Sequence, residues 1–285
     1  MPTYLFTFIH TETKSSNLQK QTNEVRPSIL SSDGELQVSE QFCPPTDQPP
    51  IPKIFHRMWI NFGKGEEPSN EYQNLTERLM KLHPGWRYIL WHEQKIITAI
   101  KEHVPFFLHT FESYDKPIKK HDSARMVILY AMGGVYLDHD VIPIKSIEPA
   151  LGTCKFVGVS GFLKDGKKFG TNNDLMGSVA KNSFLMFAIK MMNSPEIANL
   201  HVLLATGPDL LGNALKEYIR EEHPIGFKIY HPKFFALTFQ VTANSLKENG
   251  LNATIEEIKS RAPDCIFAHY FLSSWMVYYI NNTNN

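Results

Sequence analysis

The sequence carries no excess of either charge, because 29 Lys and Arg residues balance 29 Asp and Glu residues among 285. Without an overall positive field, nothing in the composition predicts binding to nucleic acid or to an acidic membrane surface. Long hydrophobic runs are also missing: the apolar stretch "YLFTFI" near the start is too short to cross a bilayer and follows no basic leader. We therefore expect no nucleic-acid partner, no transmembrane segment and no secretion signal.

Cysteine is scarce, with Cys43, Cys154 and Cys265 far apart along the chain. An odd number at such spacing fits neither a disulfide framework nor a zinc site. We expect reduced thiols, which favours an intracellular protein, either cytoplasmic or delivered into a host cell. Familiar catalytic templates are absent too: the sequence has no Walker loop, no HExxH, no GxSxG, and no GxGxxG followed by a suitable acid.

A change of composition divides the chain near residue 51. The preceding stretch is rich in Ser, Gln, Asn, Thr and Pro, which predicts a flexible extension over residues 1–50. From "IPKIFHRMWI" onwards, large apolar and aromatic residues return in short runs typical of buried strands. We place one domain over residues 51–280, and 42% apolar residues in the whole chain are enough for a substantial core.

Strand-like and helix-like segments alternate through this domain. The expected strands are "IPKIFHRMWI", "WRYILW", "VYLDHDVIPI", "KFVGVSG" and "FKIYHP". Helical spacing appears in "NEYQNLTERLMKLHP", in a segment interrupted at Pro105, in a buried helix opening at His121 or Asp122 and closing at Gly133, and in two later segments. The alternation predicts an α/β domain with a mostly parallel central sheet.

The stretch "LYAMGGVYLDHDV" is a hydrophobic segment that ends abruptly in two carboxylates. In an extended strand, Asp138 and Asp140 would share one side while His139 faces the other. The carboxyl end of a buried strand is where ligands collect in α/β sheets, and two like charges there need a cation or a large pKa shift. Oxygen ligands suit magnesium or manganese. The alternative is that both aspartates are solvated turn residues.

The run "HDSARMVILYAMGGVYLDHDV" resembles the signature of the DXD-type sugar transferases of glycosyltransferase family 32. It is also similar to the catalytic domains of the large clostridial glucosylating toxins. Further elements follow the family's order across residues 51–275, namely "IPKIFHRMWI", "GWRYILW", "NNDLMGS" and "HYFLSSW". The resemblance implies a single GT-A-type domain, Rossmann-like with helical additions, that binds a nucleotide-activated sugar through Mn²⁺ or Mg²⁺.

The resemblance also implies a metal site and catalytic residues. Asp140 would ligate the metal directly, Asp138 would contact the ribose, the sugar or the metal through water, and His269 would complete the site. Without the resemblance, a lone histidine such as His269 is more often a core residue. Asn173 and Asp174 would hydrogen-bond sugar hydroxyls, although an Asn-rich turn is the alternative.

Donor-binding residues follow from the same resemblance. Asp122 and Arg125, neighbours on one helix face, would reach the donor sugar; alternatively they are a helix N-cap or first-turn acid and its partner. Trp59 would stack on the nucleobase and Tyr136 would pack on the ribose or base, or both would belong to the core. Ser274 and Trp275 would hold the diphosphate and close over the donor. Thr206, ahead of an apolar helix, is expected to be structural.

The resulting hypothesis is a metal-dependent hexosyltransferase, retaining as in the families it resembles. The donor would be a UDP-hexose or GDP-mannose, and the acceptor a glycan, a lipid or a protein. A toxin- or effector-like enzyme acting on a host protein is one alternative. Another is a non-catalytic nucleotide-sugar or glycan-binding module. A metal-dependent phosphohydrolase would need further Asp or His ligands at strand ends, which the sequence does not cluster.

Overall fold

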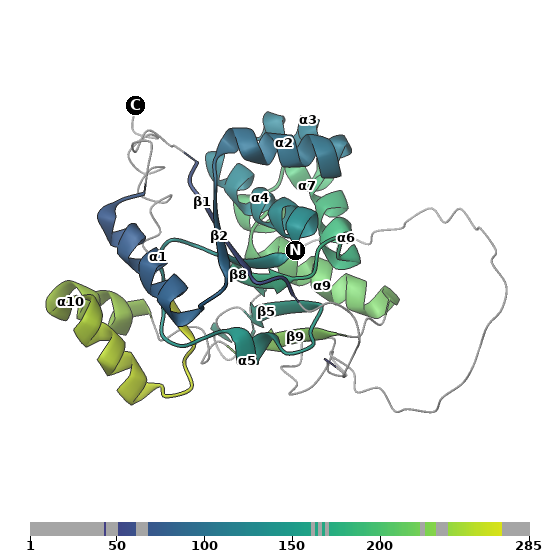
Figure 1. Cartoon of the computed structure of the whole chain (residues 1–285). Coiled ribbons are helices and arrows are strands. Elements are labelled where there is room, and N and C mark those ends of the chain that lie inside the picture. Colours follow the sequence, from purple (N-terminus) through teal and green to yellow (C-terminus); the bar gives the residue numbers. More distant parts are fainter. Residues whose placement is uncertain are drawn as a thin grey trace, which may run out of the picture.

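A central six-stranded sheet organises the protein, seen in a computed structural model that describes residues 43, 51–60, 68–160, 163–164, 167–168, 171–222, 226–231 and 239–269. Its strands run in the order β2-β1-β3-β8-β5-β9 (Figure 1). Their bounds are β1 (Ile54–Met58), β2 (Arg87–Trp91), β3 (Gly134–Leu137), β5 (Phe156–Ser160), β8 (Thr171–Ser178) and β9 (Phe227–Tyr230). Only β8 among them is antiparallel to its neighbours, so the expected mostly parallel α/β sheet is confirmed.

Helices fill the connections between these strands. They are α1 (Asn70–Leu82), α2 (Glu93–His103), the 3₁₀ helix η1 (Pro105–Phe107), α3 (Leu108–Ser113), α4 (Pro117–Met132), α5 (Glu148–Leu151), α6 (Ser183–Met192), α7 (Pro195–Ala198), α8 (Val202–Ala205), α9 (Pro208–Glu222) and α10 (Phe239–Arg261). The helical segment predicted to break at Pro105 does so, since α2 ends before this residue and η1 begins with it. Helix α10 contains a non-helical residue at Gly250.

Both faces of the sheet are covered by apolar packing. One core lies between the sheet and helices α2, α4, α6 and α9 (Figure 1), and it includes Tyr136 of β3. The other face packs against α1 and α5 and receives Val135 and Leu137 of the same strand. Alternate residues of β3 therefore enter different cores, as the twofold repeat of a strand requires. A sheet buried on both faces also explains why the central strands β3 (GVYL) and β5 (FVGVS) are almost continuously apolar.

Helix α4 delivers two predicted site residues into the interior. It begins at Pro117, whose missing N–H suits the first helical position, rather than at His121 or Asp122 as expected. Asp122 therefore lies inside the helix, and the N-cap alternative for it is wrong. The helix ends at Gly133, where φ is +65° and an added Cβ would lie 2.6 Å from the backbone nitrogen of Ala180. Glycine is thus required at the turn from α4 into β3.

A small antiparallel sheet brings the end of the described chain back to the acidic turn. It pairs β4 (Val141–Pro143) with β10 (Phe267–His269), and His269 lies opposite Val141. Val141 immediately follows Asp140 in the sequence. The register of this pair therefore places His269 beside the acidic turn. A second short pair, β6 (Leu163–Lys164) and β7 (Lys167–Lys168), lies between β5 and β8 in the sequence.

A disulfide joins Cys43 to Cys154 across a sequence separation of 111 residues. The hydroxyl of Thr153 also donates a hydrogen bond of 3.0 Å to the carbonyl oxygen of Cys43. Cys265 is a buried free thiol. The expectation of three reduced cysteines is wrong, because wide spacing along the chain does not prevent the fold from bringing two of them together. The disulfide ties Cys43 to the connection between α5 and β5.

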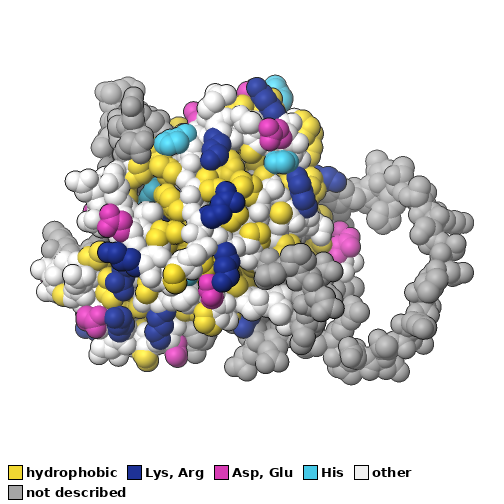
Figure 2. Space-filling model, viewed as in Figure 1, with side chains coloured by type: hydrophobic (Ala, Val, Ile, Leu, Met, Phe, Trp, Pro, Cys, Tyr) yellow, Lys and Arg dark blue, Asp and Glu magenta, His cyan; other side chains and the backbone are white. Residues whose placement is uncertain are grey.

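The described surface mixes side-chain types. On the face turned to the viewer in Figure 2, Lys and Arg side chains are interspersed with hydrophobic and uncharged ones. Within the described part of the chain, no helix combines the length and the hydropathy needed to cross a membrane.

Candidate active site

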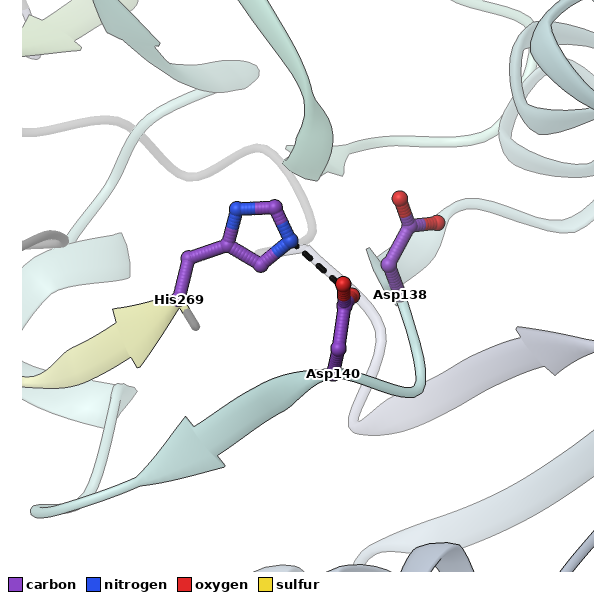
Figure 3. Close-up of side chains that lie close together, drawn as sticks. All are labelled: Asp138, Asp140 and His269. Atoms are coloured by element: carbon purple, nitrogen blue, oxygen red, sulfur yellow. Dashed lines mark hydrogen bonds and ion pairs between the residues drawn. The ribbon is translucent and has the colours of Figure 1, made fainter. Parts of the chain in front are cut away.

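The acidic turn follows directly after β3. The strand ends at Leu137, so residues 138–140 form a turn into β4 rather than the extended continuation that was expected. Asp138 and Asp140 nevertheless converge: one ligand atom from each of them and one from His269 all lie within 4.8 Å of one another. Figure 3 shows the three side chains directed toward a common space. The predicted convergence of the two carboxylates is confirmed, although a turn rather than a strand produces it.

His269 reaches this turn from the far end of the described chain. Its Nε2 lies 2.9 Å from Oδ1 of Asp140, the contact drawn as a dashed line in Figure 3. The proximity of these two residues, predicted from the sequence, is thereby confirmed. Burial alone would lower the pKa of His269, but the nearby carboxylates of Asp174 and Asp140 outweigh burial and raise the pKa to about 9. Without a metal, the imidazole is thus the counterion of the two acids.

Asp138 is held by two donors of the protein itself. The hydroxyl of Tyr136 donates to its Oδ1 at 2.8 Å, and Nη2 of Arg125 donates to its Oδ2 at 2.9 Å. Burial raises the pKa of Asp138 to about 6, against the opposing effect of Arg125. Because both oxygens already accept hydrogen bonds, the Asp138 carboxylate is fixed in orientation.

Asp122 accepts hydrogen bonds from three side chains. Its Oδ1 accepts from Nη1 of Arg125 at 2.8 Å and from Nδ2 of Asn173 at 3.1 Å, and its Oδ2 accepts from the hydroxyl of Thr206 at 3.4 Å. Burial raises the pKa of Asp122 to about 6, although Arg125 acts in the opposite direction. Arg125 therefore joins Asp122 to Asp138, which links α4 to the end of β3. Thr206 was expected to be structural, and its place before a helix gave no sign that its hydroxyl would contact Asp122.

Two adjacent residues of β8 contact different parts of the site. Asn173 donates to Asp122, whereas Oδ2 of Asp174 lies 3.2 Å from Nδ1 of His269. Successive side chains of a strand point to opposite sides, which explains the division. Backbone pairing positions Asp174 as well, since its carbonyl oxygen accepts a hydrogen bond from the N–H of Asp138 at 2.9 Å. The Asn-rich segment is thus a strand of the central sheet rather than a turn.

Two aromatic rings pack against His139, the middle residue of the acidic turn. The ring of His139 packs edge-on against Trp59 with centroids 5.5 Å apart, and it lies 5.1 Å from the ring of Tyr72 in α1. Burial lowers the pKa of His139 to about 3, so its ring is neutral. The contribution of Tyr72 was missed, because nothing in its helix distinguishes it from a surface residue.

The two aromatic residues expected at the donor differ in burial. Tyr136 is 2% exposed, and the guanidinium carbon of Arg125 lies 5.5 Å from the centre of its ring. Trp59 is only partly buried. Ser274 and Trp275 lie outside the described residues.

The donor set suits a divalent cation. Asp138, Asp140 and His269 offer two carboxylate oxygens and one imidazole nitrogen, a combination compatible with manganese or magnesium. Carboxylates also outnumber cations in the ion pairs that join the described residues of the site: Asp122, Asp138, Asp140 and Asp174 pair with Arg125 and with a protonated His269. A cluster with surplus negative charge favours an added cation. The residues present therefore fit a metal of this kind.

An α/β sheet with an Asp-x-Asp turn at a strand end, completed by a distant histidine, is the arrangement that the sequence led us to expect of a GT-A-type glycosyltransferase. Residues 69–157 match the family model described as "Glycosyltransferase sugar-binding region containing DXD motif". This range contains both Asp122 and the acidic turn. The family recognised from the sequence is confirmed: the chain carries the sugar-binding region of a DXD-type glycosyltransferase with an α/β fold.

Similar curated proteins carry related names. Mannosyl phosphorylinositol ceramide synthase SUR1 of Saccharomyces cerevisiae is 31% identical over 210 residues, which cover 67% of this chain and 52% of that protein. Inositol phosphoceramide mannosyltransferase 1 of Schizosaccharomyces pombe is 30% identical over 193 residues, covering 65% of this chain and 58% of that protein. The chain thus spans only a little over half the length of these relatives.

A solved structure named PaToxG glycosyltransferase also aligns with the chain. Its TM-score is 0.48 at 17% sequence identity, over 60% of this chain and 71% of that one.

Proposed function

We propose that the protein transfers mannose from GDP-mannose to the headgroup of a phosphoinositol-bearing lipid. The convergence of Asp138, Asp140 and His269 within 4.8 Å supports a nucleotide-sugar site, because it combines a hard-metal donor set with the DXD family match. The names of the relatives support mannose and an inositol phosphoceramide acceptor. A UDP-hexose remains the second donor to be tested, and a glycan or a protein remains the second kind of acceptor.

Asp140 and His269 would hold the metal directly in this proposal. Their facing atoms, Oδ1 and Nε2, lie 2.9 Å apart, so one cation could replace the proton between them. Asp138 would act from a fixed position, toward the ribose, the sugar or a metal-bound water, since Arg125 and Tyr136 each hold one of its oxygens in place. When bound, Mn²⁺ or Mg²⁺ would neutralise negative charge on the departing diphosphate.

Other residues would bind and orient the donor. Arg125 holds Asp122 and Asp138 together, so a sugar contacting either carboxylate would meet a preorganised pair. Trp59 would stack on the nucleobase, a role consistent with its partial exposure and with the support of its ring by His139. Ser274 and Trp275 stay predicted contacts of the diphosphate. Retention of the anomeric configuration stays a prediction as well.

The disulfide bears on the compartment in which the protein acts. Disulfides persist in oxidising surroundings and are rare in the cytosol. The Cys43–Cys154 bond therefore favours an oxidising compartment over the cytoplasmic or host-cell setting expected from the sequence. We therefore propose that the protein acts in an oxidising compartment.

A donor and acceptor screen tests the proposed function. The protein would be incubated with Mn²⁺, a panel of GDP- and UDP-sugars, and vesicles containing inositol phosphoceramide, with a glycan and a protein as other acceptors. We expect mass spectrometry to show a hexose added to the lipid from GDP-mannose. Asp140→Ala should abolish the transfer, and the exposed Asp264→Asn should leave it intact.

The same screen separates the alternatives. Transfer to protein alone would replace the lipid proposal with an effector-like activity. Donor binding without transfer to any acceptor would indicate a binding module. If no nucleotide sugar binds or reacts, the glycosyltransferase proposal fails.

A further inference from the structure

His269 is enclosed between two carboxylates, one at each ring nitrogen. Its Nε2 lies 2.9 Å from Oδ1 of Asp140, and its Nδ1 lies 3.2 Å from Oδ2 of Asp174. The residue is only 7% exposed. A half-turn of the ring would break both contacts, so the two carboxylates together set its orientation.

One of the two carboxylates lies in a turn and the other in a strand. Asp140 belongs to the turn between β3 and β4, whereas Asp174 lies within β8, a strand hydrogen-bonded on both sides. The backbone hydrogen bond from Asp138 to Asp174 fixes the strand at this position. Asp174 is therefore the more rigid support for the ring.

We propose that Asp174 is a positioning residue that accepts the Nδ1–H of His269 and leaves Nε2 to bind a divalent cation beside Asp140. This inference rests on the proposed metal-dependent function. Histidine ligands commonly donate their second N–H to a carboxylate, which fixes the tautomer and makes the coordinating nitrogen more basic. The assignment replaces the sugar contact expected of Asp174 from the sequence with a contact to the metal-binding histidine.

Asn173, the neighbour of Asp174 in β8, contacts a different part of the site. Its side chain donates to Asp122 on the other side of the strand. Asn173 therefore belongs with the residues expected to approach the donor sugar, while Asp174 belongs with the metal-binding group. The two residues should affect different steps when they are changed.

A measurement of manganese affinity tests the inference without requiring turnover. The signal of free Mn²⁺ in electron paramagnetic resonance would be titrated with the full chain and with Asp174→Ala, Asp174→Asn and Asp264→Asn. Loss of a partner that orients a histidine ligand typically weakens metal binding by about 10- to 100-fold. We expect that loss for Asp174→Ala, a smaller one for Asp174→Asn, whose amide oxygen can still accept the Nδ1–H, and none for the exposed Asp264→Asn.

Kinetics distinguish positioning of the metal ligand from contact with the sugar. If Asp174 acts through His269, a higher Mn²⁺ concentration should restore most of the kcat of Asp174→Ala. A variant that binds Mn²⁺ normally but keeps a raised donor KM at saturating metal would overturn the inference and return Asp174 to the donor site.

A metal-free measurement separates failure of this inference from failure of the proposed function. Nitrogen-15 NMR of metal-free His269 is recorded below its pKa of about 9, where both ring nitrogens carry a proton, and shows whether the Nδ1–H is hydrogen-bonded. We expect a hydrogen-bonded Nδ1–H in the unmodified protein and the loss of this hydrogen bond in Asp174→Ala. The same Nδ1–H signal in both proteins would overturn the inference even if the enzyme transfers sugar. The expected change in a protein that binds no Mn²⁺ would support the pairing of Asp174 with His269 while refuting the metal-dependent function.

Discussion

His269 and Asp140 lie 2.9 Å apart although 129 residues separate them in the sequence. The antiparallel pairing of β10 with β4 makes this contact, because His269 pairs with Val141, the residue after Asp140. The proposed metal site would be complete only when β10 is paired with β4.

Replacing Asp140 should remove metal binding and activity together. Asp140→Asn keeps the shape of the side chain but removes the charge that faces His269 and the proposed cation. We expect kcat to fall by about 100-fold or more, since a metal contributes several kcal/mol of charge stabilisation in such reactions. Steady-state kinetics and manganese titration measure the effect. Asp264→Asn makes the same chemical change at an exposed position and should behave as the unmodified protein; equal losses in both would point to a general defect.

Replacing Arg125 should destabilise the fold, because this buried side chain bridges Asp122 and Asp138. Arg125→Met leaves the buried carboxylate of Asp122 and the partly buried one of Asp138 without their cation, and breaking a buried pair in this way typically costs about 3–5 kcal/mol of unfolding free energy. Urea unfolding gives the value.

Arg261→Met is the matched control, because Arg261 forms an exposed ion pair with Glu257 at 3.0 Å. Such surface pairs contribute about 0–1 kcal/mol. Similar losses of stability in the two variants would contradict the bridging role of Arg125.

Manganese affinity should rise with pH between neutrality and about pH 9, where His269 titrates. Its raised pKa means that the metal-free ring is protonated below this value, so a metal ligated by Nε2 must displace a proton. We expect up to about a tenfold gain in affinity per pH unit from this group. Titrations at several pH values would test the slope, and His269→Gln should flatten it. An unchanged slope in His269→Gln would assign the proton to another group.

The metal-free protein should show the opposite trend in stability. The pKa of His269 is raised from 6.5 to about 9 on folding, so its protonation stabilises the folded state fully below about pH 6.5. This contribution should disappear as the pH rises through 9. Urea unfolding in a chelator should therefore show the unmodified protein losing its advantage over His269→Gln across this range. A constant difference would mean that the imidazolium is not paired with the carboxylates.

Breaking the disulfide should lower the melting temperature. The bond spans 111 residues, and in the chain-entropy model a loop of about this length stabilises the folded state by roughly 4–5 kcal/mol. Thermal unfolding with and without reductant measures the effect. The variant with both Cys43→Ser and Cys154→Ser is the control, since it should melt lower and respond no further to reductant. Alkylation of the denatured, unreduced protein should label only Cys265; three labelled thiols would refute the bond.

Local sequence patterns were sufficient for much of the fold. The alternation of strand-like and helix-like segments predicted the mostly parallel sheet, and Pro105 marked the break between α2 and η1. The pattern was misleading where two local signals competed: Asp122 resembles a helix start, but Pro117 begins the helix earlier. Polar residues inside a buried helix cannot be assigned from spacing alone, because their partners come from other elements.

The candidate site was predictable only in part. The family resemblance, carried by the sequence itself, named Asp138, Asp140 and His269 together. It could not show that Arg125 and Tyr136 occupy both oxygens of Asp138, that Thr206 contacts Asp122, or that Asp174 faces His269. Each of these contacts joins residues on different elements or depends on the exact exit of the chain from β3.

The sequence by itself determined the α/β class, the DXD family and the residue types that can hold a divalent cation. Each of these depends on composition, on short-range periodicity or on a motif of a few residues. The tertiary structure alone decided the disulfide and the network around Asp138 and His269. These contacts depend on strand register and on how distant segments pack, and the free energy of that packing is shared across the whole core rather than encoded in any single segment.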